Sequence, residues 1–136
     1  MIKAGFKYLL VAFFVAGGVN HFLSPEFYLP LMPPYIPAHE FMVALSGATE
    51  IVAGIMLAIP KTSKWGAWFI IAHLLIFFTV HIYMIQEAAT EFAEIPLAAL
   101  WIRIPFQFLF IAWAFWFTRG ASSDQAETPA PVAEAS

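Results

Sequence analysis

Four long apolar stretches dominate this sequence and leave little choice of fold. They cover residues 4–23, 41–59, 65–85 and 95–117, and each is close to the ~20 residues with which a helix crosses the hydrocarbon core of a bilayer. With 62% hydrophobic and 11% charged residues, the chain has too few polar side chains to cover a water-soluble domain of its size. The sequence therefore predicts an all-α integral membrane four-helix bundle, formed as one unit by residues 1–118.

The connections between the apolar stretches indicate how the helices run. Residues 60–64 form a short turn, and the connection after residue 85 is short and acidic, so neighbouring helices are expected to be antiparallel. Residues 24–39 contain five prolines, which disfavours a continuous helix. This Pro-rich segment is expected at the surface, either as a rigid link between two helices or as a lid over polar residues.

Basic residues lie on one side of the predicted bundle only. The termini and the 60–64 turn share that side and contain Lys3, Lys7, Lys61, Lys64 and Arg119. The other two connections contain no Lys or Arg. Because basic residues near span ends are retained on the cytoplasmic side, both termini are expected in the cytoplasm and the Pro-rich loop on the outer side.

The two ends of the chain need separate interpretations. Lys3 and Lys7 before an apolar run also fit a secretory signal peptide, but the apolar character resumes after the small residues 16–18. The first helix is therefore expected to be retained. Residues 119–136 are rich in Ala, Pro, Ser and acidic residues, and they are expected to form a disordered cytoplasmic tail.

Several polar side chains lie inside the apolar stretches, where an unpaired charge costs several kcal/mol. If each helical residue rises ~1.5 Å, His21 and His81 lie about 3 and 6 Å from the outer ends of their helices. Arg103, Glu50 and Gln107 lie deeper, at about 12 to 18 Å. These five residues are expected to form a cluster in the outer half of the membrane.

Glu50 is the most informative member of this cluster. Gly47 and Gly54 share its helical face, and small residues there allow another helix to approach closely. Arg103 is the one permanently charged cation at a comparable depth, so we expect it to pair with Glu50 directly or through water. The pair is either a functional site or a buried ion pair that fixes helix register, and we favour the functional site.

Histidines on two further helices complete the candidate site. Asn20 and His21 share a face of the first helix, and His73 and His81 share a face of the third. His73 is expected to be only a satisfied hydrogen-bonding residue. No catalytic residue is assigned. The candidates for ligand binding or proton transfer are Glu50, Arg103, His81, His21, Gln107 and Asn20.

Three kinds of bound group are compatible with this cluster: a haem, a metal ion and a small organic ligand. Imidazoles on neighbouring helices can ligate a haem, and His21, His81 and Glu50 can ligate a metal ion, but no spacing demands either group. Both rank below a small organic ligand such as a quinone, and no metal site is assigned. The sequence contains no Cys, which excludes iron–sulfur clusters and dithiol chemistry, so any redox role must use a borrowed group.

A set of motifs occurs in order along the chain. The motifs are GVNHF at 18–22, FYLPLMPPYIP at 27–37, SGATEI at 46–51 with Gly54, HIYM at 81–84 and RIPFQ at 103–107. Together they resemble the DoxX-like membrane proteins. The resemblance implies a multi-pass protein of the bacterial inner membrane, and it carries over the polar positions without assigning roles to them. Relatives sometimes have Asn in the third helix, where this chain has His81.

The resemblance also points toward redox metabolism, because DoxX-like relatives include a subunit of a thiosulfate:quinone oxidoreductase and a partner in an oxidative-stress complex. The leading functional hypothesis is thus a quinone-linked redox accessory subunit. The alternatives are a non-enzymatic small-molecule or proton transport or binding protein, and a scaffold or assembly factor of a membrane complex. The expected partners are the lipid bilayer and a membrane or peripheral oxidoreductase, and a bundle this small is compatible with a homo-oligomer. No nucleic-acid partner is expected.

Overall fold

The computed structural model describes residues 2–119, which form helices and turns but no strand. Four helices are long and apolar enough to cross a membrane, as expected from the sequence, and their ends lie within two residues of the predicted spans. Two short helical turns fill the first connection. The elements are α1 (Ile2–Leu23), α2 (Pro25–Tyr28), η1 (Leu29–Leu31), α3 (His39–Ala58), α4 (Ser63–Gln86) and α5 (Leu97–Thr118).

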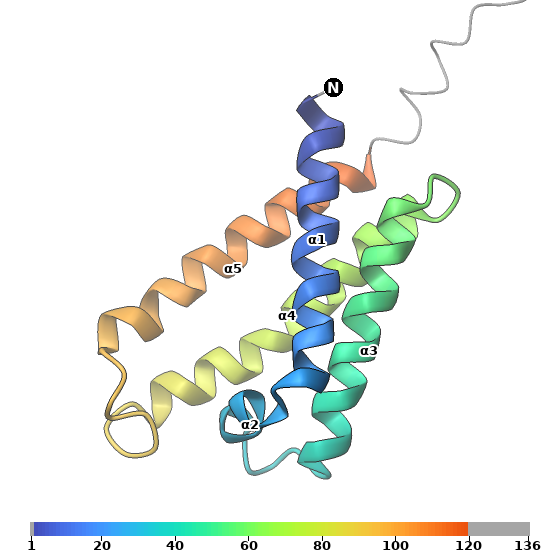
Figure 1. Cartoon of the computed structure of the whole chain (residues 1–136). Coiled ribbons are helices and arrows are strands. Elements are labelled where there is room, and N and C mark those ends of the chain that lie inside the picture. Colours follow the sequence, from blue (N-terminus) through green and yellow to red (C-terminus); the bar gives the residue numbers. More distant parts are fainter. Residues whose placement is uncertain (1, 120–136) are drawn as a thin grey trace, which may run out of the picture.

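The four long helices pack in the order α1, α3, α4, α5 (Figure 1). α1 lies along α3, α3 packs on α4 across a tight turn, and α4 lies along α5. The backbones of α1 and α5 hardly touch, and aromatic side chains bridge them instead. Phe13 of α1 meets Phe110 of α5 edge to face, with ring centroids 5.7 Å apart. The bundle is therefore open along its α1/α5 side.

Glycines set the close contact between α1 and α3. A Cβ added to Gly18 would lie 2.6 Å from the carbonyl oxygen of Gly47, and one added to Gly54 would lie 2.8 Å from the side chain of Val15. Only a residue without a side chain fits where two backbones come this near. The expectation that Gly47 and Gly54 admit a neighbouring helix beside Glu50 is confirmed.

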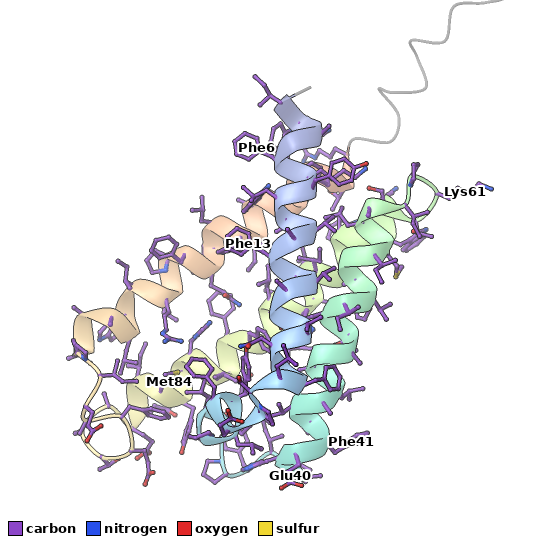
Figure 2. All side chains as sticks on the ribbon, viewed as in Figure 1. Phe6, Phe13, Glu40, Phe41, Lys61 and Met84 are labelled. Carbon is purple, nitrogen blue, oxygen red and sulfur yellow. The ribbon has the colours of Figure 1, made fainter. Side chains whose placement is uncertain are left out.

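The core of the bundle lies toward the end at which α1 begins and α5 ends. Its buried residues come from all four long helices, and they are Leu10, Phe14, Ala53, Leu57, Ala67, Ile70, Ile71, Leu74, Ala114 and Phe117. Many other large apolar side chains are largely exposed, among them Phe6, Phe13 and Phe41 (Figure 2). This pattern suits a protein whose outer surface meets lipid rather than water.

The Pro-rich segment does not form a continuous helix, as expected from its prolines. After α2 and η1, the chain turns back at Ala38, the one non-glycine residue between residues 2 and 119 with a positive φ (52°). His39 then begins α3, and its Nε2 lies 3.1 Å from the carbonyl oxygen of Pro33. The segment contacts α1, α3 and α4 and so covers one end of the bundle. Of the predicted tail, only Arg119 belongs to the described residues, and 120–136 lie outside them.

Replacing Gly66 with Ala tests the packing of α4 against α3. The new Cβ would lie less than 3.0 Å from backbone atoms of Met56 and Leu57, which cannot move aside as a flexible side chain would. We expect the free energy of unfolding, measured by titration with SDS in mixed micelles, to fall by about 1–3 kcal/mol. Gly5→Ala is the matched control, because nothing lies within 4 Å of its added Cβ. Equal stability of the two variants would contradict this packing.

Candidate functional site

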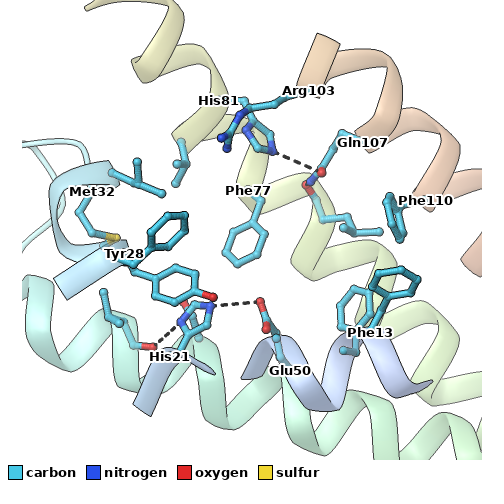
Figure 3. Close-up of a pocket in the computed structure, with 18 residues that line it drawn as sticks. Phe13, His21, Tyr28, Met32, Glu50, Phe77, His81, Arg103, Gln107 and Phe110 are labelled. Carbon is cyan, nitrogen blue, oxygen red and sulfur yellow. Dashed lines mark hydrogen bonds and ion pairs between the residues drawn. The ribbon is translucent and has the colours of Figure 1, made fainter. Parts of the chain in front are cut away.

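A cavity of about 320 Å³ lies between the four long helices, beneath α2 and η1 (Figure 3). Its walls are mostly apolar and include Phe77, Phe110 and Leu31. Five of the six predicted site residues line it, from α1, α3, α4 and α5: His21, Glu50, His81, Arg103 and Gln107. The structure thus brings together side chains that are up to 86 positions apart in the sequence, from His21 to Gln107.

Glu50 lies at one end of the cavity, between two imidazoles. Its Oε1 lies 3.2 Å from Nε2 of His73 and 3.5 Å from Nε2 of His21. All three side chains are buried. Gly17 leaves the room that Glu50 needs, because a Cβ at that position would lie 3.2 Å from Oε2. A buried carboxylate is costly unless it is paired, and here the histidines are its partners.

The expected direct pairing of Glu50 with Arg103 is wrong. Among residues 2–119, the basic side chains within 4.0 Å of the Glu50 carboxylate are those of His21 and His73 only. Depth along a helix was a poor guide, because α5 packs on α4 and not on α3, which carries Glu50. Both side chains nevertheless line the same cavity, and Figure 3 shows Phe77 between them.

Arg103, His81 and Gln107 form the other polar end of the cavity. Nε2 of His81 lies 3.3 Å from Oε1 of Gln107, and the Gln107 amide donates a 2.7 Å hydrogen bond to the carbonyl oxygen of Leu74. The guanidinium of Arg103 makes one hydrogen bond within residues 2–119, a long contact of 4.0 Å with Sδ of Met84. Its charge therefore has no carboxylate partner in this part of the chain.

Asn20 does not line the cavity, but it contacts the Pro-rich segment that covers it. Its Nδ2 donates a 2.8 Å hydrogen bond to the hydroxyl of Tyr28 in α2. The Tyr28 ring stacks on His21, with ring centroids 3.8 Å apart and planes 23° from parallel. Phe27 and Met32 of the same segment also line the cavity. The Pro-rich segment is thus fixed over the cavity by one hydrogen bond and one stacked ring.

Two residues at the site were missed from the sequence. His73 was expected to be only a satisfied hydrogen-bonding residue, yet it contacts Glu50 directly. Its spacing of eight from His81 placed both on one face of α4, which was the available signal. Tyr28 is given no role by the sequence, because nothing in a sequence shows which ring a loop tyrosine will stack on.

The structure also bears on the metal and haem alternatives. Residues 2–119 contain no group of three His, Asp or Glu side chains arranged to hold a metal ion. His21 and His81 lie at different polar ends of the cavity, with Glu50 and with Gln107 respectively. What the cavity presents is a cationic donor at one end, a carboxylate–imidazole cluster at the other, and apolar rings between them. Such walls suit a small, mostly apolar molecule with polar groups at both ends.

Fold and cavity together define a small multi-pass helical membrane protein with an internal cavity that is polar at both ends. Residues 10–118 match the family described as "Domain of unknown function (DUF8561)", and the chain therefore belongs to that family. The matched region contains all four long helices, except the first turns of α1, and every residue that lines the cavity. No curated protein and no solved structure matches the chain.

Replacing Tyr28 with Phe tests how the cover is held. The variant keeps the ring on His21 but loses the hydrogen bond from Asn20, which is worth about 1 kcal/mol. We expect hydrogen–deuterium exchange of residues 25–32 to become about fivefold faster. Tyr35→Phe is the matched control, because Tyr35 is 68% exposed and should leave exchange unchanged. Identical exchange in the two variants would mean that the hydrogen bond does not hold the cover.

Proposed function

We propose that this protein is a redox-associated accessory subunit whose cavity binds the head group of a quinone or a similar small organic ligand. The observation that carries the proposal is the pair of polar ends on an otherwise apolar cavity. A quinone ring has two oxygens on opposite sides, and it matches such a cavity in chemistry and in size.

The Arg103 end supplies the first half of the ligand site. Its guanidinium is permanently charged and has no carboxylate partner among residues 2–119, which is costly in an apolar region. A ligand oxygen that accepts a hydrogen bond from Arg103 removes part of that cost. His81 and Gln107 lie beside it and define the space into which such an oxygen fits.

The Glu50 end supplies the second half, because it combines a carboxylate with imidazoles that can exchange protons near neutral pH. Reduction of a quinone adds two electrons and two protons, so a proton-exchanging group beside one ring oxygen suits this ligand. The electrons must come from a partner or a further bound group, since the sequence contains no Cys to carry them. The role proposed here is therefore that of an accessory subunit, docked on a membrane or peripheral oxidoreductase or on a second copy of itself.

The open side of the bundle supports a ligand that arrives from the membrane. Between α1 and α5 the wall consists of aromatic side chains such as Phe13 and Phe110, and not of packed backbones. Both rings also line the cavity. A lipid-soluble molecule can place its head group inside and leave an apolar tail between these helices.

We also propose that the protein lies in the bacterial inner membrane, with antiparallel spans and both termini in the cytoplasm. Lys61 and Lys64 in the α3–α4 turn support this orientation, because basic residues are retained on the cytoplasmic side. The Pro-rich cover and the acidic α4–α5 connection then face outward. The ordered motifs that resemble DoxX-like proteins support the same setting, and a relationship between the two families is part of the proposal.

The absence of Cys from the sequence makes the orientation easy to test. Single variants Tyr35→Cys, Lys61→Cys and Glu91→Cys each place one thiol at an exposed position in a different connection. In intact cells we expect a membrane-impermeant maleimide to label the Tyr35 and Glu91 variants but not the Lys61 variant. Opening the inner membrane should then expose Lys61→Cys. The reverse pattern would place the termini outside.

Replacing Arg103 with Gln tests the ligand site itself. Decylubiquinone and menadione, titrated into the protein in nanodiscs by calorimetry, are the probes. Loss of a charged hydrogen bond should weaken binding of the quinone that the wild type accepts by about 10- to 100-fold. Arg119→Gln is the matched control, because Arg119 lies beyond the end of α5, away from the cavity. Equal affinity of the two variants would remove Arg103 from the site.

Two other outcomes lead to the alternative functions. If neither quinone binds and Glu50→Gln unfolds the protein, the buried cluster is structural and a scaffold or assembly role takes first place. A second candidate, proton-coupled transport or binding of a small molecule, is favoured by the burial of Glu50 between two histidines. It requires a pH-dependent flux in proteoliposomes that Glu50→Gln abolishes.

A further inference from the structure

Hydrogen positions at the Glu50 end determine what that end offers a ligand. Nε2 of His73 and Nε2 of His21 both face the same carboxylate oxygen, Oε1 of Glu50, at 3.2 and 3.5 Å. His21 and Glu50 line the cavity, whereas His73 does not. The other ring nitrogen of each histidine has a partner that fixes where its hydrogen lies.

The partner of His21 is a backbone carbonyl. Nδ1 of His21 lies 3.0 Å from the carbonyl oxygen of Val43, and a carbonyl oxygen can only accept a hydrogen bond. Nδ1 therefore carries a hydrogen. In its neutral form His21 then has no hydrogen on Nε2, so it presents an acceptor to Glu50 and to the cavity.

The partner of His73 is the hydroxyl of Thr49, whose single hydrogen is already used. Thr49 Oγ1 donates to the carbonyl oxygen of Ser46 at 2.9 Å, and the longer contact, 3.4 Å, is with Nδ1 of His73. Toward His73 the hydroxyl can thus only accept, so Nδ1 of His73 carries a hydrogen. Neutral His73 also presents a bare Nε2 to Glu50.

An ionised Glu50 between two such neutral rings would place three acceptors together with no hydrogen among them. Unsatisfied polar groups are expensive in apolar surroundings, so the cluster must hold an additional proton. A proton between Oε1 and the nearer ring, His73, satisfies that contact and leaves the cluster without net charge. A second proton would give a positive cluster in a cavity that already contains the charge of Arg103.

His81 follows the same logic at the opposite end. The amide of Gln107 donates to Leu74, which turns its oxygen toward His81, so Nε2 of His81 must donate to that oxygen. Nδ1 of a neutral His81 is then an acceptor, and it is buried without a partner among residues 2–119. Each end of the cavity therefore contains one imidazole with an unfilled acceptor nitrogen.

We propose that the His21–Glu50–His73 cluster holds one proton between Glu50 and His73 and leaves Nε2 of His21 free to accept a hydrogen bond from a ligand hydroxyl. The inference rests on the proposed function and narrows its ligand class. The cavity selects a ring with hydroxyl groups, the quinol, over the quinone with carbonyl groups. A hydroxyl supplies the hydrogen that Nε2 of His21 lacks, whereas a carbonyl oxygen there would meet a second acceptor.

The proton arrangement can be measured in the protein without any ligand. The chain has four histidines, so nitrogen NMR of ¹⁵N-histidine-labelled protein in nanodiscs gives few signals, and single variants such as His39→Gln assign them. We expect Nδ1 of both His21 and His73 to be protonated and Nε2 of His21 to be bare at neutral pH. A protonated Nε2 on His21, or a His73 with its only hydrogen on Nε2, would overturn the inference.

Ligand preference provides the second arm. Decylubiquinone and menadione are each compared with their quinols under anaerobic conditions, and we expect the quinol to bind about tenfold more tightly. Thr49→Val removes the acceptor that holds the hydrogen of His73 on Nδ1. Neutral His73 can then carry its hydrogen on Nε2 and donate it to an ionised Glu50. The additional proton of the cluster moves to Nε2 of His21. The quinol preference should then disappear, and Thr49→Ser, which keeps the hydroxyl, should retain it.

The two arms separate failure of this inference from failure of the proposed function. Equal binding of quinol and quinone in the wild type, both weakened by Arg103→Gln, would overturn the proton arrangement and leave the ligand site in place. Absence of binding by all four probes would overturn both the quinol preference and the proposed function. A quinol preference that survives in Thr49→Val would show that Thr49 and His73 do not position the proton, and it too would overturn the inference.

Discussion

The cost of keeping Glu50 buried in an apolar bundle is the constraint on which the rest of the structure depends. A lone carboxylate there would be worth several kcal/mol of destabilisation, so its partners must come from other helices. α1 contributes His21 and α4 contributes His73, which ties three of the four long helices to one oxygen atom. This pairing depends on the glycines that bring α1 against α3, because the side chains of His21 and Glu50 meet only when the two helices are in close contact.

The guanidinium of Arg103, which is partly buried, has no such partner in the described part of the chain. Arg103 comes from α5, the helix with the fewest neighbours, and no acidic side chain of residues 2–119 reaches it. The carboxylate of Glu50 thus has partners within the protein, whereas the guanidinium of Arg103 has no carboxylate partner among residues 2–119. A fold selected only for stability gains nothing from an unpaired guanidinium, which supports the proposal that the cavity is a binding site.

The helices could be predicted from the sequence and the pairing of their side chains could not. Length and hydropathy located α1, α3, α4 and α5 within two residues, since both are local properties. Gly47 and Gly54 correctly indicated a close neighbour for the Glu50 face. The partner of Glu50 was assigned from depth and permanent charge, and neither shows which helices are adjacent or how they are rotated. His73 was interpreted as a hydrogen-bonding residue only, because the sequence does not show that its side chain faces Glu50 of α3.

The open side between α1 and α5 has a consequence for the environment of the protein. Three sides of the cavity are walls of packed helices, and the fourth consists of aromatic side chains. In a bilayer, hydrocarbon chains would lie beyond these aromatic side chains. Lipid would then form part of the wall of the cavity as well as surround the protein. Chain length, unsaturation and lateral pressure of the host bilayer become variables that tune the volume of the cavity, and a detergent micelle removes all of them at once.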